Sequence, residues 1–131
     1  MGQPAAKQGD QIQATDIHLT LVPAPSGTAT VPLPYVFNGI IDGELSSNVK
    51  INGKAAATVG STATNTPSHI AQGIQFSTPP SNKGTIQRGS ATVKINGKAA
   101  ARSGDTALTC NDPTDAPVGT VIAVSTVMIG G

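Results

Sequence analysis

The nonapeptide Val-Lys-Ile-Asn-Gly-Lys-Ala-Ala-Ala occurs twice in this chain of 131 residues, at Val49–Ala57 and at Val93–Ala101. Each copy begins with a short β-favouring run that leads into Asn-Gly. Asn-Gly between two such runs is the strongest short hairpin signal, because a type I′ turn needs positive φ at both central residues. The sequence therefore predicts hairpin turns at Asn52-Gly53 and at Asn96-Gly97. The identity also continues into a second block of small residues, Gly60, Thr62 and Ala63 in one copy and Gly104, Thr106 and Ala107 in the other.

A third copy of the motif is divided between the two ends of the chain. The last residues, Thr126–Gly131, resemble Thr92–Gly97, and the first residues, Pro4–Asp10, resemble Lys98–Asp105. We therefore expect Met128–Gly131 to lie antiparallel beside Pro4–Ala6 and to complete a third hairpin. Three similar hairpins imply pseudo-threefold symmetry. The alternative is a simple tandem duplication, but such an array does not need complementary half-repeats at its ends.

Small side chains limit the core that this chain can build. Its only aromatic residues are Tyr35, Phe37 and Phe76, and it has no Trp. Apolar burial contributes only about 25 cal/mol per Å², so a chain rich in Ala, Val and Thr needs a metal or a partner surface to support it. The repeated alanines are expected near the symmetry axis, where only small side chains fit; they are Ala5, Ala6, Ala56, Ala57, Ala100 and Ala101.

Composition excludes several structural and functional classes. Net charge is +1 and the lysines are scattered, so the clustered basic and aromatic residues of a nucleic-acid surface are missing. The N-terminus has no apolar segment typical of a signal peptide. Val118–Ile129 is too short and too interrupted to be an integral membrane segment. The single Cys110 excludes an internal disulfide framework.

Between the hairpins the sequence is rich in Pro, Gly, Ser, Thr and Asn, and no helical periodicity is apparent. These segments are predicted to be irregular connectors within one domain, residues 1–131, rather than linkers to a second domain. They are Pro23–Pro34, Thr64–Gly73 and Ser77–Gly84. The fold class expected from the sequence is all-β, with three β-hairpins related by a pseudo-threefold axis and the third closed by the two termini.

The start Pro4–Asp10 and the repeated strand-Asn-Gly-Lys-x-Ala-Ala-x-x-Gly-Asp unit resemble the PAAR-repeat family, and the best single stretch is Val93–Cys110. The resemblance covers the whole chain. The chain departs from the pattern at Lys7, which replaces the Arg of the first motif, and at Ser61, which replaces the Asp of the middle copy. It also has Ala55 and Ala99 where Pro is common. The resemblance implies a small pointed cone with a zinc ion near its apex.

The resemblance also implies a function and a partner. Family members cap the trimeric β-helical spike of contractile injection machines, such as type VI secretion systems and phage-tail-like particles. We therefore expect a structural spike tip that sharpens the spike for envelope penetration. It should be a monomer when alone and bind one copy per homotrimeric spike protein. It should be made in the bacterial cytoplasm without a signal peptide, assembled into the particle and delivered to the extracellular space or a target cell.

The two histidines and the single cysteine are the candidate metal ligands. His18 and His69 each lie nine residues after equivalent glycines of the repeat, Gly9 and Gly60, and Cys110 follows the Gly-Asp of the third copy. Imidazole and thiolate are preferred ligands of structural zinc, which usually has four protein donors. Zinc is favoured over iron for this donor set.

The fourth donor is left open, because the family's usual set is three histidines and one cysteine and this chain has no third histidine. Asp112, Asp16, a water molecule and a hydroxyl such as that of Thr66 are the candidates.

Two other functions compete with the spike tip. A small zinc-dependent hydrolase would use the same histidines with an open coordination position, but it also needs a substrate cleft and a general base. The chain has none of the common hydrolase or nucleotide-binding motifs. A carrier for a separate effector or toxin is the other alternative. Since the third hairpin uses both ends of the chain, we expect no fused effector domain, and any passenger would be bound non-covalently.

Overall fold

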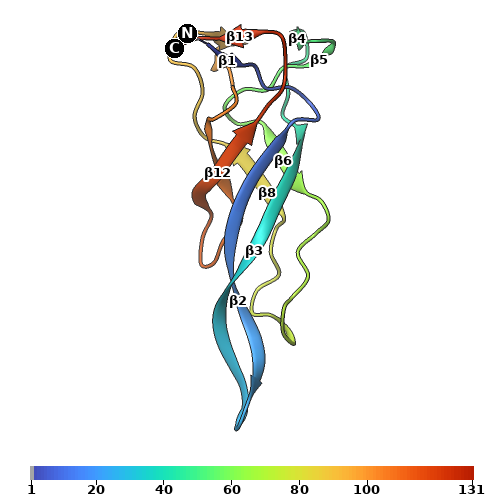
Figure 1. Cartoon of the computed structure of the whole chain (residues 1–131), viewed down its shortest axis with the longest axis vertical. Helices are drawn as coiled ribbons and strands as arrows, with labels where there is room; N and C mark the ends of the chain where they lie inside the picture. The colour runs from blue at the N-terminus through green and yellow to red at the C-terminus, as the bar shows by residue number, and fades with distance from the viewer. Residues whose placement is uncertain (1) are drawn as a thin grey trace.

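The computed structural model describes residues 2–131, which form strands and connecting loops only. Figure 1 shows a broad, flat end that carries both termini and a body that tapers to a two-stranded point. The expected all-β cone is therefore confirmed. Among the described residues no helix is long and apolar enough to cross a membrane.

The broad end is made of three two-stranded hairpins. Both predicted Asn-Gly turns are present, with positive φ at Asn52 (48°) and Gly53 (83°), and at Asn96 (54°) and Gly97 (81°). These values are those of a type I′ turn, which matches the natural twist of the flanking strands. The hairpins are β4 (Lys50–Ile51) with β5 (Lys54–Ala55), β9 (Lys94–Ile95) with β10 (Lys98–Ala99), and β1 (Gln3–Pro4) with β13 (Met128–Ile129).

The third hairpin joins the two ends of the chain, as predicted. Pro4 lies opposite Met128 in an antiparallel register, and the Ala5 amide donates to the carbonyl oxygen of Val127 at 2.8 Å. The other two hairpins make the equivalent bond, from Ala56 to Val49 and from Ala100 to Val93, both at 3.0 Å. The duplicated nonapeptide is thus one unit of a threefold arrangement that the chain closes without a covalent bond.

A ring of three backbone hydrogen bonds surrounds the pseudo-threefold axis. The amide of Ala6 donates to the carbonyl of Ala101 (2.9 Å), Ala101 donates to Ala57 (3.1 Å), and Ala57 donates to Ala6 (3.0 Å). These alanines and their neighbours Ala5, Ala56 and Ala100 are at most 1% exposed, which confirms the expectation that they line the axis. Three segments of the chain approach one another so closely here that each has room for only a methyl side chain.

A tight turn explains why the spacing of the Gly-Asp motif is repeated along the chain. The backbone N–H of Lys7 donates to Asp10 Oδ2 (3.0 Å) and that of Arg102 donates to Asp105 Oδ2 (2.7 Å). The Asp105 carboxylate also binds the guanidinium of Arg102 and raises its pKa. In the middle unit, Ser61 Oγ accepts the equivalent bond from the backbone N–H of Thr58 at 2.9 Å. The hydroxyl therefore replaces the carboxylate without loss of the turn.

Below the ring, the body is a closed sheet of antiparallel strands to which each unit contributes two. Because the last strand also pairs with the first, this part of the sheet has no free edge. In spatial order the strands are β2 (Gln11–Ala24), β3 (Gly27–Gly43), β6 (Thr62–Asn65), β8 (Lys83–Ile86), β11 (Thr106–Thr109) and β12 (Ala116–Ile122). The short β7 (Gln75–Phe76) adds to the outer edge of β2 nearer the point.

The interior changes from apolar to polar along the axis. Just below the alanine ring, Ile12, Phe37 and Ile41 are fully buried in the main apolar cluster. Further along the same inward face of β2 come Asp16 and His18, which are equally buried. The narrowing body therefore replaces its apolar core with a polar one before it ends.

One predicted connector is wrong. Pro23–Pro34 was expected to be irregular, but it forms the distal ends of β2 and β3, which pair continuously from Gln11↔Ile40 to Ala24↔Gly27. Proline is compatible with these strands because Pro23, Pro32 and Pro34 all take positions whose N–H would point away from the partner strand. The other two predicted connectors are irregular for most of their length, and only Thr64–Asn65 and Lys83–Gly84 belong to strands.

The alanine ring yields a stability prediction. Ala101→Val adds two methyl groups at a fully buried position on the axis, so we expect it to lower the free energy of unfolding by about 1–3 kcal/mol. Ala91→Val, at an exposed loop position, is the control and should change the stability by less than about 0.5 kcal/mol. Urea denaturation followed by circular dichroism measures both. Equal stability of the two variants would contradict close packing at the axis.

Candidate metal centre

Strand β2 places two of the candidate residues on one face. Asp16 and His18 are two positions apart, so both side chains point into the cone, where Asp16 is 0% and His18 is 1% exposed. The next inward residue, Thr20, bonds to the hydroxyl of Tyr35 on β3 at 2.7 Å. The ring of Tyr35 in turn packs edge-on against His18, with ring centroids 5.7 Å apart. The hairpin therefore holds the His18 ring in a fixed place.

His69 enters the site from the loop that follows β6. Its backbone N–H donates to Asn82 Oδ1 (2.9 Å), and its Nδ1 lies 3.2 Å from the side-chain nitrogen of Asn65. Asn65 is itself fixed, because its Oδ1 accepts from the N–H of Asn38 at 2.8 Å. In this arrangement Nδ1 accepts a hydrogen bond, and Nε2 donates to Asp16 Oδ2 at 2.9 Å.

Cys110 comes directly after β11 and reaches the same place. Its thiol is buried, and Sγ lies 3.3 Å from Asp16 Oδ2 and 3.6 Å from His18 Nε2. Burial, and secondly the Asp16 carboxylate, raise the pKa of this thiol to about 12. Without a cation nearby, the thiol therefore stays protonated at neutral pH.

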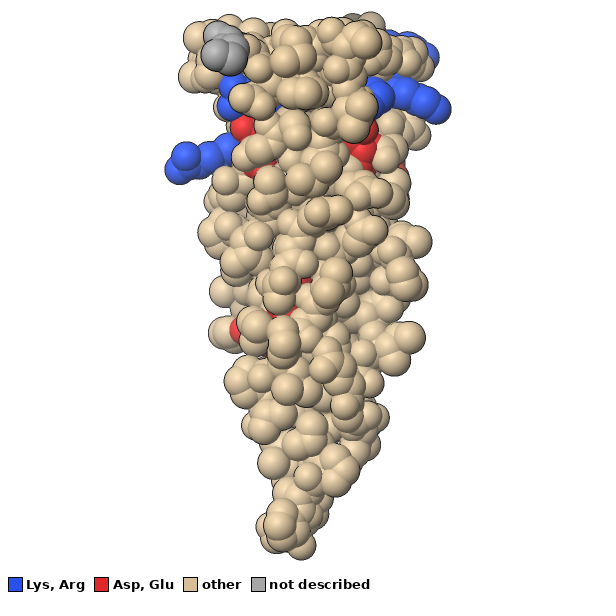
Figure 2. Space-filling model, viewed as in Figure 1, with Lys and Arg blue, Asp and Glu red and all other residues tan. Residues whose placement is uncertain are grey.

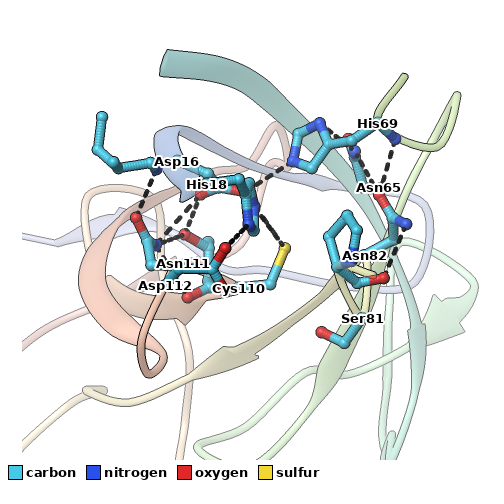
Figure 3. Close-up of polar contacts among 12 residues, drawn as sticks. Asp16, His18, Asn65, His69, Ser81, Asn82, Cys110, Asn111 and Asp112 are labelled. Atoms are coloured by element: carbon cyan, nitrogen blue, oxygen red, sulfur yellow. Dashed lines mark hydrogen bonds and ion pairs between the residues drawn. The ribbon is translucent and has the colours of Figure 1, made fainter. Parts of the chain in front are cut away.

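The three residues singled out from the sequence thus lie together, as Figure 3 shows, and Asp16 joins them. One ligand atom from each of Asp16, His18, His69 and Cys110 lies within 4.8 Å of the other three. Of the other donors considered, Asp112 lies behind the ring, with Oδ2 3.5 Å from His18 Nδ1, and the Thr66 hydroxyl turns away to the carbonyl of Thr64.

The donor set fits a cation. A tetrahedral zinc with ligands at about 2.0–2.3 Å has its ligand atoms roughly 3.3–3.8 Å apart. Asp16 Oδ2 lies 2.9 Å from His69 Nε2, 3.3 Å from Cys110 Sγ and 3.8 Å from His18 Nε2, and all four ligand atoms lie within 4.8 Å of one another, so shifts of about 1 Å would bring them into this range. A carboxylate with no exposed surface is costly unless it is paired. The group as a whole is compatible with zinc.

Several residues around the site were not found from the sequence. Thr109 donates its hydroxyl hydrogen to Asp16 Oδ1, and the side-chain nitrogen of Asn111 lies 3.5 Å from the same atom. Tyr35, Asn65 and Asn82 fix the two histidines. None of these residues belongs to a recognisable sequence motif. The period-2 spacing of Asp16 and His18 was a usable signal, but only once that segment is known to be a strand.

A comparison with protein-family models matches the PAAR motif over residues 36–107 and 76–131. The chain belongs to the PAAR motif family. A search of curated proteins finds no match. The family supports a spike-tip role in contractile injection systems. This agrees with the resemblance drawn from the repeated alanine and Gly-Asp units.

The burial of Cys110 yields a reactivity prediction. A side chain that is 3% exposed is out of reach of a reagent in solution, so iodoacetamide at pH 8.5 should modify the native protein at least about tenfold more slowly than the urea-unfolded chain. Mass spectrometry over time measures both rates. Native and unfolded rates within a factor of two of each other would contradict the placement of the thiol.

Proposed function

We propose that this protein caps the end of a homotrimeric spike in a contractile injection machine, with one copy per trimer. The observation that carries the proposal is the ring of hydrogen bonds among Ala6, Ala57 and Ala101. It gives one chain three nearly equivalent sectors around an axis. A threefold-symmetric partner can therefore meet each sector with the same part of each subunit.

The surface of the broad end supports this docking. Ile51, Ile95 and Ile129 cluster over the axis together with Ala5, Ala56 and Ala100, and the three isoleucines are 6–8% exposed. Val93, Val127 and Met128 on the same hairpins are more exposed, at 36%, 38% and 57%. Apolar residues on a flat face suit the end of a β-helical trimer, where strand edges and an apolar axis need a cover.

Figure 1 places both termini at this broad end, so the opposite, pointed end carries only the β2–β3 hairpin. This arrangement agrees with a tip whose point faces away from the spike to which it binds. In the proposed role the protein is one domain, residues 1–131, made in the bacterial cytoplasm and carried outward on the particle. A non-covalently bound effector remains compatible with this role.

We further propose that His18, His69, Cys110 and Asp16 hold one structural zinc ion. Such an ion supplies folding energy to the part of the cone that is too narrow for an apolar core. Asp112 Oδ2 lies 3.5 Å from His18 Nδ1, which is buried without a hydrogen-bond partner, so a small shift would let Asp112 accept the Nδ1 hydrogen and leave Nε2 free toward the site. Zinc binding at His69 Nε2 would place the ring hydrogen on Nδ1, so the present contact of Nδ1 with the side-chain nitrogen of Asn65 would have to be given up, while Asn65 Oδ1 keeps its bond from the N–H of Asn38.

The burial of the donors favours this structural role over hydrolysis. The side chains of Asp16, His18 and His69 are 0%, 1% and 3% exposed, so a substrate has little access to an ion held among them. A hydrolytic zinc needs an open position that a substrate can reach. Here Asp16 would fill the fourth coordination position, which a hydrolytic site keeps open for water or substrate.

Metal analysis tests the proposed ligands. The purified protein should contain one zinc ion per chain, and chelation should lower its melting temperature. His69→Ala, Cys110→Ser and Asp16→Asn should each weaken zinc binding by at least about tenfold. Asp115→Asn, at an exposed acidic position, and Thr66→Ala are the controls and should bind zinc normally. A native protein that is free of metal yet unaffected by added zinc would reject the site.

Stoichiometry tests the capping role. Mixed with its trimeric spike, the protein should co-elute in gel filtration with one copy per trimer, as measured by light scattering or native mass spectrometry. Alone it should be a monomer, because its three units already satisfy one another. Three copies per spike trimer, or a stable homotrimer of this chain, would reject the proposal.

A further inference from the structure

The two oxygens of the Asp16 carboxylate have different neighbours. Oδ2 lies 2.9 to 3.8 Å from the ligand atoms of the three other candidate ligands. Oδ1 lies on the other side of the carboxylate, where it accepts a hydrogen bond from the hydroxyl of Thr109 and lies 3.5 Å from the side-chain nitrogen of Asn111. Figure 3 shows Asn111 beside Asp16. Only one oxygen of this carboxylate is therefore turned toward a bound ion.

The hydroxyl of Thr109 is itself held in one orientation. Asn111 Oδ1 accepts from the backbone N–H of Ile17 at 2.7 Å, which fixes the side-chain nitrogen at the other branch of the amide. That nitrogen donates to the Thr109 carbonyl at 3.1 Å and lies 3.3 Å from the Thr109 hydroxyl oxygen. An ionised carboxylate only accepts, so the one hydroxyl hydrogen of Thr109 is directed at Asp16 Oδ1.

Burial makes this bond costly to break. Thr109 and Asp16 are both 0% exposed. If the carboxylate rotated to offer both oxygens to an ion, the hydroxyl of Thr109 would lose its acceptor in a place without water. A buried donor left without a partner is more costly than the same donor at a surface. The bond to Thr109 therefore resists that rotation.

The charge of Asp16 is not balanced by a Lys or Arg. Within the described residues, its ion-pair contacts are with His18 and His69 alone. Lys and Arg gather instead at the broad end, on the face that Figure 2 shows. A bound dication would be balanced by this carboxylate and by the thiolate of Cys110 together, and the buried centre would be neutral. The environment of Asp16 thus suits a metal ligand better than a structural ion pair.

We propose that Thr109 is the positioning residue that makes Asp16 a one-oxygen ligand, and that it thereby gives the site its preference for a four-coordinate ion. The inference rests on the proposed zinc site. With one oxygen from Asp16 the protein supplies four donors, which is the usual number for structural zinc. With both oxygens it would supply five, an arrangement suited to larger cations, which often take a carboxylate through both of its oxygens.

Three variants isolate the hydroxyl. Thr109→Val removes it and keeps the shape of the side chain, whereas Thr109→Ser keeps the hydroxyl and removes a methyl group. Thr120→Val makes the first of these changes at an exposed position of β12 and is the matched control. Circular dichroism of each protein loaded with zinc checks the fold. Thr109→Ala, which removes the hydroxyl and leaves a smaller side chain, replaces Thr109→Val if that variant does not fold.

Cobalt(II) in place of zinc reports the coordination number, because a four-coordinate cobalt ion absorbs visible light much more strongly than an ion with more ligands. The wild type, Thr109→Ser and Thr120→Val should all give the intense four-coordinate spectrum. Thr109→Val should give a weaker spectrum, because the released Oδ1 of Asp16 adds a fifth donor.

Competition between zinc and the larger cadmium ion measures the preference itself. After dialysis against both ions, elemental analysis gives the ratio of the two affinities. Thr109→Val should shift this ratio toward cadmium by about tenfold, while Thr109→Ser and Thr120→Val should stay within about twofold of the wild type. A merely structural role for Thr109 would weaken the binding of both ions equally and leave the ratio unchanged.

An unchanged cobalt spectrum or an unchanged zinc-to-cadmium ratio in Thr109→Val would overturn the inference. So would a wild-type cobalt spectrum that is not four-coordinate. These results are separable from a failure of the proposed site. A wild type that binds zinc, together with a Thr109→Val variant that behaves like it, keeps the zinc site and removes only the role of Thr109. A wild type that binds no metal rejects both.

Discussion

The closed ring of hydrogen bonds among three alanine backbones is the constraint on which the rest of the structure depends. Each unit must reach the axis with a residue no larger than Ala, since Ala6, Ala57 and Ala101 donate to and accept from one another around it. Shortly after the ring, each of the three segments turns at a glycine with positive φ: 92° at Gly9, 95° at Gly60 and 93° at Gly104. The three strands that follow therefore start at the same height on the cone, and this sets the register of the closed sheet.

Below this level the three units diverge. The first extends into the long β2–β3 ribbon, the second forms a mostly irregular loop that carries His69, and the third returns after a short loop that begins with Cys110. Their polar residues nevertheless converge on Asp16, because the inward faces of the strands share one narrowing axis. The threefold arrangement at the broad end thus brings chemically different side chains together at one point. Three identical repeats would bring three identical side chains there.

The sequence was a good guide wherever a local rule decides the backbone. Asn-Gly determines the hairpin turns, and the split motif places Met128 beside Pro4. The prediction failed at Pro23–Pro34, because proline usually excludes a strand, and only the register shows that these prolines avoid the ladder. The candidate ligands His18, His69 and Cys110 were found from their spacing after the repeated glycines. Asp16 could not be separated from Asp112, since that choice depends on the inward face of β2 for Asp16 and on the path of the loop after β11 for Asp112.

The third hairpin is closed without a covalent bond. The order of the strands along the chain therefore depends only on which of the three hairpins is left open. The ends at Gln3 and Ile129 already lie opposite each other in a strand pair, as Ile51 and Lys54 do across the Asn52-Gly53 turn. A two-residue link is enough to join such a pair. A circular permutant that joins the present ends and opens at Asn52-Gly53 or Asn96-Gly97 would keep every strand pairing of the cone. The three units are in this sense one ring, and Gln3 and Ile129 flank one of three equivalent places to open it.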